Sequence, residues 1–467
     1  MSETNVHPQE VLRRAEHLRR SLSGNFRDEM VKSLYAEAEQ VARKAVRTAG
    51  QRKYDFDRAL DRLVTSPWTG LPIMLLLLAL IIWITVIGAN IPSELLAQLF
   101  FGIEAFAADL FTAWGVPWWL TGFLWHGVWR GLAWVVSVML PPMAIFFPLF
   151  TFLEDLGYLP RVAFNLDWLF KRAGAHGKQA LTMAMGFGCN AAGVVATRVI
   201  DSPRERLVAI LTNNFVPCNG RFPTLILLAT VFVAASFPPA FASFIAAGTV
   251  VLVVLIGVAF TFLMSWLLTR TLLRGEASAF TLELPPYRPP NLLRILYTSL
   301  IDRTIFVLWR AIQTAAPAGA VIWVLANIYL GSMSLAQHIA NFLNPFGHLL
   351  GLDGAILLAY IIAIPANEIV VPTLLMIYMG TGMMTELPSL TALKDLLVNQ
   401  HGWTLLTAVN LMLFSLLHNP CATTILTIYK ETGSKKWAAW SVVITLGTAF
   451  LVTFLVASVV RAIFGAG

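Results

Sequence analysis

The sequence predicts an all-α polytopic membrane protein with about eight transmembrane helices in an inverted repeat, containing two re-entrant segments and broken helices. Of the 467 residues, 57% are hydrophobic and 13% are charged, whereas a soluble domain usually carries about 25% charge. Windows of about 20 residues, such as Gly70 to Ala89 and Val442 to Val460, are almost wholly apolar, and each could cross roughly 30 Å of hydrocarbon as a helix. The alternating segments of a spanning β-barrel do not occur in the sequence, so helices are the predicted spanning structure.

Charge and cysteine content agree with this class. The net charge of +7 needs no nucleic-acid partner, because cytoplasmic loops of membrane proteins collect Lys and Arg. The three cysteines are odd in number and lie in apolar segments, which argues against a disulfide framework. The N-terminus is polar and charged for over 60 residues, so we expect no cleavable signal peptide, a cytoplasmic N-terminus and a multi-pass location in the cell (cytoplasmic) membrane, the inner membrane of a bacterium.

The chain divides into four predicted parts. Residues 1–66 are expected to form a small cytoplasmic helical domain, because 11–22 and 29–49 show helical periodicity with an apolar stripe. Such a polar helix pair is more typical of a docking surface than of a binding site. The first transmembrane half is then 67–269, a basic Pro-rich cytoplasmic loop is 270–303, and the second transmembrane half is 304–467.

The first half begins with the span at 70–89. The next stretch, 90–116, has no Lys or Arg and is expected to lie outside the cell. A Trp-rich stretch follows, which predicts an interfacial helix leading into the span at 134–153. His126 and Arg130, at i and i+4, lie on the same side of this helix.

A re-entrant segment is predicted next. Seven basic residues lie between Glu154 and Arg206, so this side is cytoplasmic. The apolar segment "ALTMAMGFGCNAAGVVATRV" lies between Lys178 and Arg198, and a full crossing would put one of these charges outside. A segment that enters and returns at its Gly-rich centre keeps both inside. Such non-helical backbone is tolerated at membrane depth where it is buried or lines a cavity.

The second half repeats the first in opposite orientation. Residues 207–235 are predicted to cross outward with a break at "VPCNGRFP", 241–269 to cross back, and 305–329 to cross outward again. Between Gly331 and Gly402 there is one basic residue, Lys394, so the broken segment "IPANEIVVP" should enter and return from outside. Residues 403–428, broken at "LLHNPCATT", and 437–460 complete the repeat. Paired broken helices in inverted repeats indicate a transporter's midplane site.

Four polar breaks should converge at this site. Their side chains are thiols, an imidazole, a carboxylate and amides, which suit a transition divalent cation better than Mg²⁺. A carboxylate at the bilayer centre costs about 2.5–3.5 kcal/mol on insertion scales, and a bound dication would offset that cost. The candidate metal ligands are Cys189, Asn190, Cys218, Asn219, Asn367, Glu368, His418 and Cys421. The metal is expected as transported substrate, with no cofactor.

These residues lie in segments with a family resemblance. "LEDLGYLPRVAFNLDWLF", "GFGCNAAGVVATR", "PRERLVAILTNNFVPCNGRFPTLI", "PANEIVVPTLLMIY" and "HNPCATTILTIYKETGSKKWA" resemble the membrane domain of the ferrous-iron transport protein B family (FeoB), with its two Gate segments. The resemblance covers roughly Asp55 to Val460. It implies inward Fe²⁺ transport, with Cys189 as the cysteine of the first Gate, Cys421 as the thiol of the Pro-Cys pair and Glu368 as the acidic residue of the second Gate.

The sequence departs from that family in two places. It contains no G-x-x-x-x-G-K-[ST] phosphate loop, so we expect no intrinsic GTPase and no enzyme activity, and a separate G protein or small accessory protein becomes a candidate partner of the N-terminal helices. "GCNAAG" lacks the proline that commonly follows the Cys-Asn pair in the family, which leaves Mn²⁺, Zn²⁺, Co²⁺ and Mg²⁺ as alternative metals.

Two other functions remain open from the sequence. A nucleoside or other organic-solute carrier could use the same inverted repeat, with Asn and Glu as hydrogen-bonding groups and the cysteines incidental. A membrane assembly or signalling subunit would use the N-terminal helices for docking and transport nothing itself. The sequence also leaves open the energy source and the oligomeric state, including a homo-oligomer.

Overall fold

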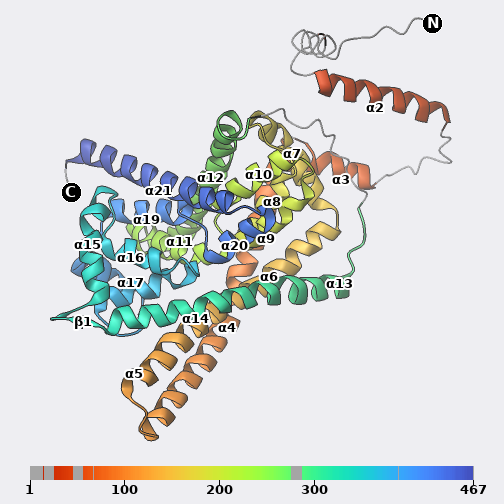
Figure 1. The fold of residues 1–467 in the computed structure, drawn as a ribbon. Coiled ribbons are helices and arrows are strands. Elements are labelled where there is room, and N and C mark those ends of the chain that lie inside the picture. The colour runs from red at the N-terminus through yellow and green to blue at the C-terminus, as the bar shows by residue number, and fades with distance from the viewer. Residues whose placement is uncertain are drawn as a thin grey trace, which may run out of the picture.

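The computed structural model describes residue 14 and residues 26–45, 56–66, 68–274, 287–385, 387 and 389–465. This part is almost entirely helical (Figure 1), and its only strands are β1 (Tyr329–Leu330) and β2 (Met333–Ser334), which form a short antiparallel hairpin. Among these residues, seven helices are long and apolar enough to cross a membrane, or eight if a pair bent by 111° forms one span. The predicted all-α membrane class is therefore confirmed.

Two helices precede the first span, α2 (Phe26–Ala45) and α3 (Phe56–Val64). The first of them coincides with the helix predicted at 29–49. The other predicted helix, at 11–22, lies outside the described residues apart from residue 14.

Helix α3 is anchored to the first half by an ion pair. The fully buried Arg161 places its Nε 2.9 Å from Asp61 Oδ1, donates through Nη1 to the Gly157 carbonyl at 2.6 Å, and lies over the Tyr287 ring. Burial alone would raise the pKa of Asp61, but the hydrogen bonds and the guanidinium charge of Arg161 lower that pKa below its ordinary value. The Asp61–Arg161 pair thus holds α3 in a defined position just before the first membrane span begins.

The first span is longer than predicted, because α4 runs unbroken over Gly70–Ala113. Its 44 residues correspond to roughly 66 Å at 1.5 Å per residue, about twice the hydrocarbon thickness. The segment 90–113, expected as an outside connection, continues the helix because it is rich in Leu and Ala. In Figure 1, the end of α4 forms a hairpin with α5 (Trp118–Thr121) and the helical turns that follow it, and this hairpin projects from the other helices.

A buried carboxylate holds this hairpin together. Glu104 on α4 is 1% exposed, and its two oxygens lie 2.6 Å from His126 Nδ1 and 3.0 Å from Arg130 Nε. The shared helix side predicted for His126 and Arg130 therefore has a structural role, which is to pair with Glu104.

The rest of the first half contains the predicted breaks. Its elements are η1 (Gly122–Trp129), α6 (Arg130–Asp155), α7 (Tyr158–Arg172), α8 (Gln179–Gly188), α9 (Asn190–Ala196), η2 (Thr197–Val199), α10 (Pro203–Thr212), η3 (Asn213–Phe215), η4 (Asn219–Arg221), α11 (Phe222–Leu228), η5 (Ala229–Val233), η6 (Ala234–Ser236) and α12 (Pro239–Arg270). Helices α8 and α9 meet at Cys189, and α10 and α11 are separated around Cys218, as the sequence indicated.

The second half has matching breaks. Its elements are α13 (Leu292–Tyr297), η7 (Thr298–Ile305), α14 (Phe306–Asn327), α15 (Leu335–Leu349), α16 (Gly354–Ile362), η8 (Asn367–Ile369), α17 (Val370–Met379), α18 (Leu390–Lys394), η9 (Asp395–Gln400), α19 (Leu405–Leu417), α20 (Ala422–Thr432) and α21 (Lys435–Phe464). Helices α16 and α17 are separated before Asn367, and α19 and α20 are separated at His418 to Cys421. The bent pair is α15 with α16.

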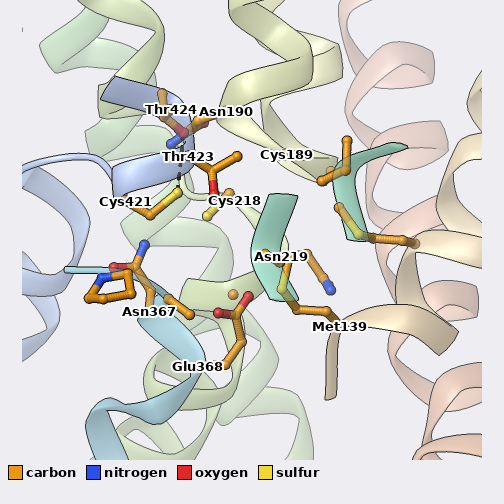
Figure 2. Close-up of a pocket in the computed structure, with 17 residues that line it drawn as sticks. Met139, Cys189, Asn190, Cys218, Asn219, Asn367, Glu368, Cys421, Thr423 and Thr424 are labelled. Carbon is orange, nitrogen blue, oxygen red and sulfur yellow. Dashed lines mark hydrogen bonds between the residues drawn. The ribbon is translucent and has the colours of Figure 1, made fainter. Parts of the chain in front are cut away.

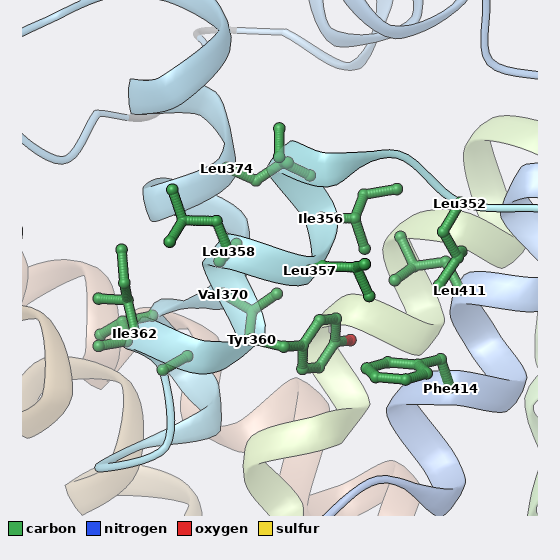
Figure 3. Close-up of a cluster of buried hydrophobic side chains, with 14 of the residues drawn as sticks. Leu352, Ile356, Leu357, Leu358, Tyr360, Ile362, Val370, Leu374, Leu411 and Phe414 are labelled. Carbon is green, nitrogen blue, oxygen red and sulfur yellow. The ribbon is translucent and has the colours of Figure 1, made fainter. Parts of the chain in front are cut away.

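Protein encloses the second re-entrant segment on nearly all sides. Every residue of α16 except Ile361 is buried, as expected of a helix that is apolar all round. Figure 3 shows its side chains packed against α17 and α19, with Tyr360 edge-on to Phe414 at 5.1 Å between ring centroids. This burial provides the condition under which irregular backbone is tolerated at membrane depth.

Candidate metal site

The four predicted breaks meet at one small cavity (Figure 2). Seven of the eight candidate ligands line it: Cys189, Asn190, Cys218, Asn219, Asn367, Glu368 and Cys421. Its volume is about 30 Å³, which is enough for an ion or one or two waters. Segments more than 200 residues apart in the chain therefore contribute to a single site.

All three cysteines occupy the residue before a helical turn. Cys189 precedes α9, Cys218 precedes η4 and Cys421 precedes α20, each with extended backbone. Likewise, Asn367 and Glu368 open the short turn η8. The first N–H groups of a helix lack intrahelical partners and form its positive end. The site therefore presents its thiols and carboxylate where backbone dipoles favour negative charge.

The carboxylate of Glu368 lies directly against the backbone of Gly220. A Cβ added at Gly220 would be 2.1 Å from Glu368 Oε1 and 2.6 Å from its Cδ, far inside van der Waals contact. Only glycine leaves room for the carboxylate here. The break in the first half thus determines where the acidic group of the second half lies.

The first re-entrant tip is fastened to the broken span behind it. Asn213 Nδ2 donates to the backbone carbonyl of Asn190 at 3.1 Å. A Cβ added at Gly193 would be 2.5 Å from Asn213 Nδ2, so glycine permits this close approach. With its amide oriented to donate, Asn190 reaches the carbonyls of Gly186 at 3.1 Å and Val216 at 3.2 Å. The tip carrying Cys189 is therefore held at a defined position.

His418 does not line the cavity. Its Nδ1 donates to the carbonyl oxygens of Ser415 at 2.9 Å and Phe414 at 3.2 Å, and its Nε2 lies 3.2 Å from Asn367 Oδ1. Because Nδ1 carries the proton, a neutral ring presents a lone pair at Nε2. An Asn367 amide turned to donate to that lone pair directs its oxygen away from the ring. The structure thus places His418 behind Asn367, where it can orient that side chain.

Sequence reasoning missed Arg221, which is 1% exposed and lies between the two broken spans. Its Nη1 donates to the carbonyls of Leu416 at 2.7 Å and Asn214 at 3.0 Å, and its Nη2 donates to those of His418 at 3.1 Å and Asn419 at 3.5 Å. The signal in the sequence was an arginine inside an apolar segment, which is rarely present without a partner or a role.

Other cavity residues also came only from the structure. Met139 and Met143 on α6 line the cavity one turn apart and add thioether sulfur. Thr424 lies beside the thiol of Cys421, with 3.3 Å between Oγ1 and Sγ. In the described part of the chain, no three His, Cys, Asp or Glu side chains are grouped at the spacing of a metal site. To hold an ion, the broken segments would therefore have to move closer together, or the ion would have to be bound in part by amide oxygens and thioether sulfurs.

Comparisons with known proteins agree with the geometry. The Gate family, described as "Nucleoside recognition", matches residues 136–232 and 308–435, and the family "Ferrous iron transport protein B C terminus" matches residues 250–302. The two Gate matches contain the two re-entrant segments and all seven cavity-lining candidates. The chain belongs to the FeoB family.

Several curated FeoB proteins are similar to this chain. The "Fe(2+) transporter FeoB" of Staphylococcus aureus is 29% identical over 417 residues, which is 86% of this chain and 59% of that protein. The Campylobacter jejuni protein of the same name is 26% identical, with 88% of this chain and 67% of the relative covered, and that of Methanocaldococcus jannaschii is 30% identical, with 70% and 48% covered. The chain thus spans about three fifths of the Staphylococcus relative. No solved structure matches the chain.

Proposed function

We propose that this FeoB-family protein carries Fe²⁺ across the cytoplasmic membrane through the cavity between its four helix breaks. The observation that carries the proposal is the convergence of three thiols, one carboxylate and three amides from both halves on one small volume. Sulfur donors favour a transition cation, whereas Mg²⁺ prefers oxygen donors and retains its waters. Mn²⁺, Zn²⁺ and Co²⁺ are the competing ions for the same donors.

The mechanism we propose is alternating access around this cavity. The re-entrant segment tipped by Cys189 serves as the inner gate, and the one tipped by Asn367 and Glu368 serves as the outer gate. Thiolates from Cys189 and Cys421 supply soft ligands, and the Glu368 carboxylate balances the charge of the ion. Asn190 and the Asn367 side chain that His418 orients supply amide oxygens.

The charge distribution supports an orientation with α20 and the end of α9 toward the cytoplasm. Arg198, Arg206 and Lys430 lie at this end, and both arginines pair with Glu431 at 2.6–2.9 Å. The part of the hairpin beyond the first span, residues 90–121, contains no Lys or Arg. Positive charge accumulates on the cytoplasmic side, so we place this part of the hairpin outside.

The size of the cavity argues against an organic solute. Pockets for small organic ligands usually enclose about 300–1,000 Å³, whereas this one has about 30 Å³. A nucleoside would need the four broken segments to separate widely, and the Asn190 amide would have to leave its backbone partners.

Metal uptake into proteoliposomes tests the proposal. Vesicles that contain the protein and an Fe²⁺-sensitive dye, handled anaerobically, should show uptake that Glu368→Gln and Cys189→Ser each lower at least tenfold. Glu94→Gln, at an exposed position on α4, is the matched control and should leave uptake unchanged. Normal uptake by both site variants would refute the site, and competition by Mn²⁺, Zn²⁺ or Co²⁺ in the same vesicles ranks the metals.

Helix α2 supports a docking role for the N-terminal region. Its side chains Met30, Leu34 and Val41 are 48%, 58% and 61% exposed, so an apolar stripe on a charged helix lacks a partner among the described residues. We propose that a separate G protein or a small accessory protein covers this stripe. Loss of co-purification with such a partner in a Leu34→Glu, Val41→Glu variant is the expected result, and unchanged capture would contradict it.

A further inference from the structure

A second, larger cavity lies next to the site. We call it the vestibule. It encloses about 460 Å³, and six waters at about 30 Å³ each occupy roughly 180 Å³, so a fully hydrated divalent cation fits inside. Its walls include Ala192 and Ala196 on α9, and Glu154 and Val199 are exposed at its mouth. Val199 is next to Arg198, so the mouth is at the basic end of the molecule.

Two side chains separate the vestibule from the site cavity. Val307 on α14 and Thr423 on α20 are the residues that line both volumes. Arg310, one turn along α14 from Val307, donates through Nη1 to Thr427 Oγ1, one turn along α20 from Thr423, at 3.0 Å, and this bond joins the same two helices. The partition is therefore the seam between α14 and α20, and a hydrogen bond fastens that seam.

We infer that the cation leaves the site through the seam between α14 and α20, past Val307 and Thr423, and enters the vestibule as a hydrated divalent ion. The Arg310–Thr427 hydrogen bond holds this exit closed. This exit route rests on the proposed transport function. Val307 and Thr423 form its constriction, and we call the Arg310–Thr427 hydrogen bond its latch.

The chemistry of the vestibule suits release. Its walls are mainly apolar and contain no thiol, so an ion that has left the sulfur donors of the site regains water as its ligand. Conduction needs binding that is weak enough to let the ion leave. The guanidinium of Arg310 also repels a dication in this low-dielectric wall, which opposes return from the cytoplasmic side, while Glu154 at the mouth attracts the ion outward.

Substitutions at the partition test the route. In Fe²⁺-dye proteoliposomes, Val307→Phe should lower the transport rate at least tenfold. Ala196→Phe, at a residue that lines the vestibule but not the site cavity, should lower the rate while Fe²⁺ bound per protein, measured by anaerobic equilibrium dialysis, stays within twofold of wild type. The matched control is Val251→Phe, on the apolar outer face of α12 where Val251 is 47% exposed, and it should transport like wild type. Val307→Ala, which thins the partition, and Thr427→Val, which removes the latch at constant size, should each raise the rate at least threefold.

The outcomes separate the exit route from the transport function. If wild-type protein neither binds nor transports Fe²⁺, the proposed function fails. If wild type transports Fe²⁺ and Val307→Phe does so equally fast, the exit lies elsewhere and only the route is overturned. If Val307→Phe does not fold, Val307→Ala and Thr427→Val decide, and unchanged or slower transport in both overturns the route.

Discussion

Gly220→Ala tests whether the carboxylate position matters for the metal. The added Cβ would be 2.1 Å from Glu368 Oε1, so the oxygen must retreat by about 1.3 Å to reach an ordinary contact of about 3.4 Å. The obstructing atom is the far end of a side chain, so the loss of folding stability should stay near the low end of the 1–3 kcal/mol typical of overpacking. A binding group needs placement within about 0.5 Å, so the retreat removes it from the site.

We expect Fe²⁺ affinity to fall by about tenfold to a hundredfold, or about 1.4–2.8 kcal/mol. The assay is equilibrium dialysis under anaerobic conditions, with uptake into dye-loaded vesicles as a second readout. Gly248→Ala is the matched control, because no atom lies within 4 Å of a Cβ at that position. It should bind and transport like wild type.

A double-mutant cycle shows whether the effect acts through Glu368. In a Glu368→Ala background the carboxylate is absent, so Gly220→Ala should add almost nothing to the loss. If the two losses simply add, the alanine acts on another group. If Gly220→Ala binds and transports as well as Gly248→Ala, the carboxylate is not needed where the structure places it, and the reasoning is refuted.

Two further predictions concern the charges that anchor the fold. Asp61→Asn should weaken the docking of α3 by about 2 kcal/mol. This is less than the 3–5 kcal/mol of a fully buried pair, because the Asp61 side chain is 32% exposed. Amide exchange of the α3 backbone, residues 56–64, should therefore become about 30-fold faster. Because folding lowers the pKa of Asp61, wild-type docking should be constant above about pH 4 and weaken as pH falls through the lowered value. Protection factors in 56–64, which are exchange rates corrected for the intrinsic rate at each pH, that are equal at pH 7 and pH 3 would contradict the pairing. Arg221→Met should leave four backbone carbonyls without a hydrogen-bond donor, at a cost of about 1–3 kcal/mol each. The thermal unfolding midpoint of this variant should therefore fall well below that of the surface control Arg62→Met. Equal midpoints would show that Arg221 is dispensable for stability.

The places where the helices break could be predicted because the cause of each break is local. Polar residues together with Gly or Pro in an apolar run, as at Cys189 and Pro420, favour a break in a regular helix. The flanking charges Lys178 and Arg198 also indicated that the first re-entrant segment returns to the side it came from. The length of α4 was predicted wrongly, since the helix continues through Gly88 and Pro92 near the expected end and nothing in its sequence marks the membrane surface.

The sequence by itself determined the membrane class, the helix breaks and seven residues that line one cavity, since composition and local backbone chemistry decide these features. Only the tertiary structure decided that Gly220 and Glu368 touch, that His418 lies behind Asn367, and that Arg221 joins both broken spans. These contacts join segments that are 51 to 195 residues apart. Tertiary packing determines these contacts, because a buried guanidinium or carboxylate pairs with the polar groups that folding brings close to it. The spacing of residues in the sequence does not indicate which groups these are.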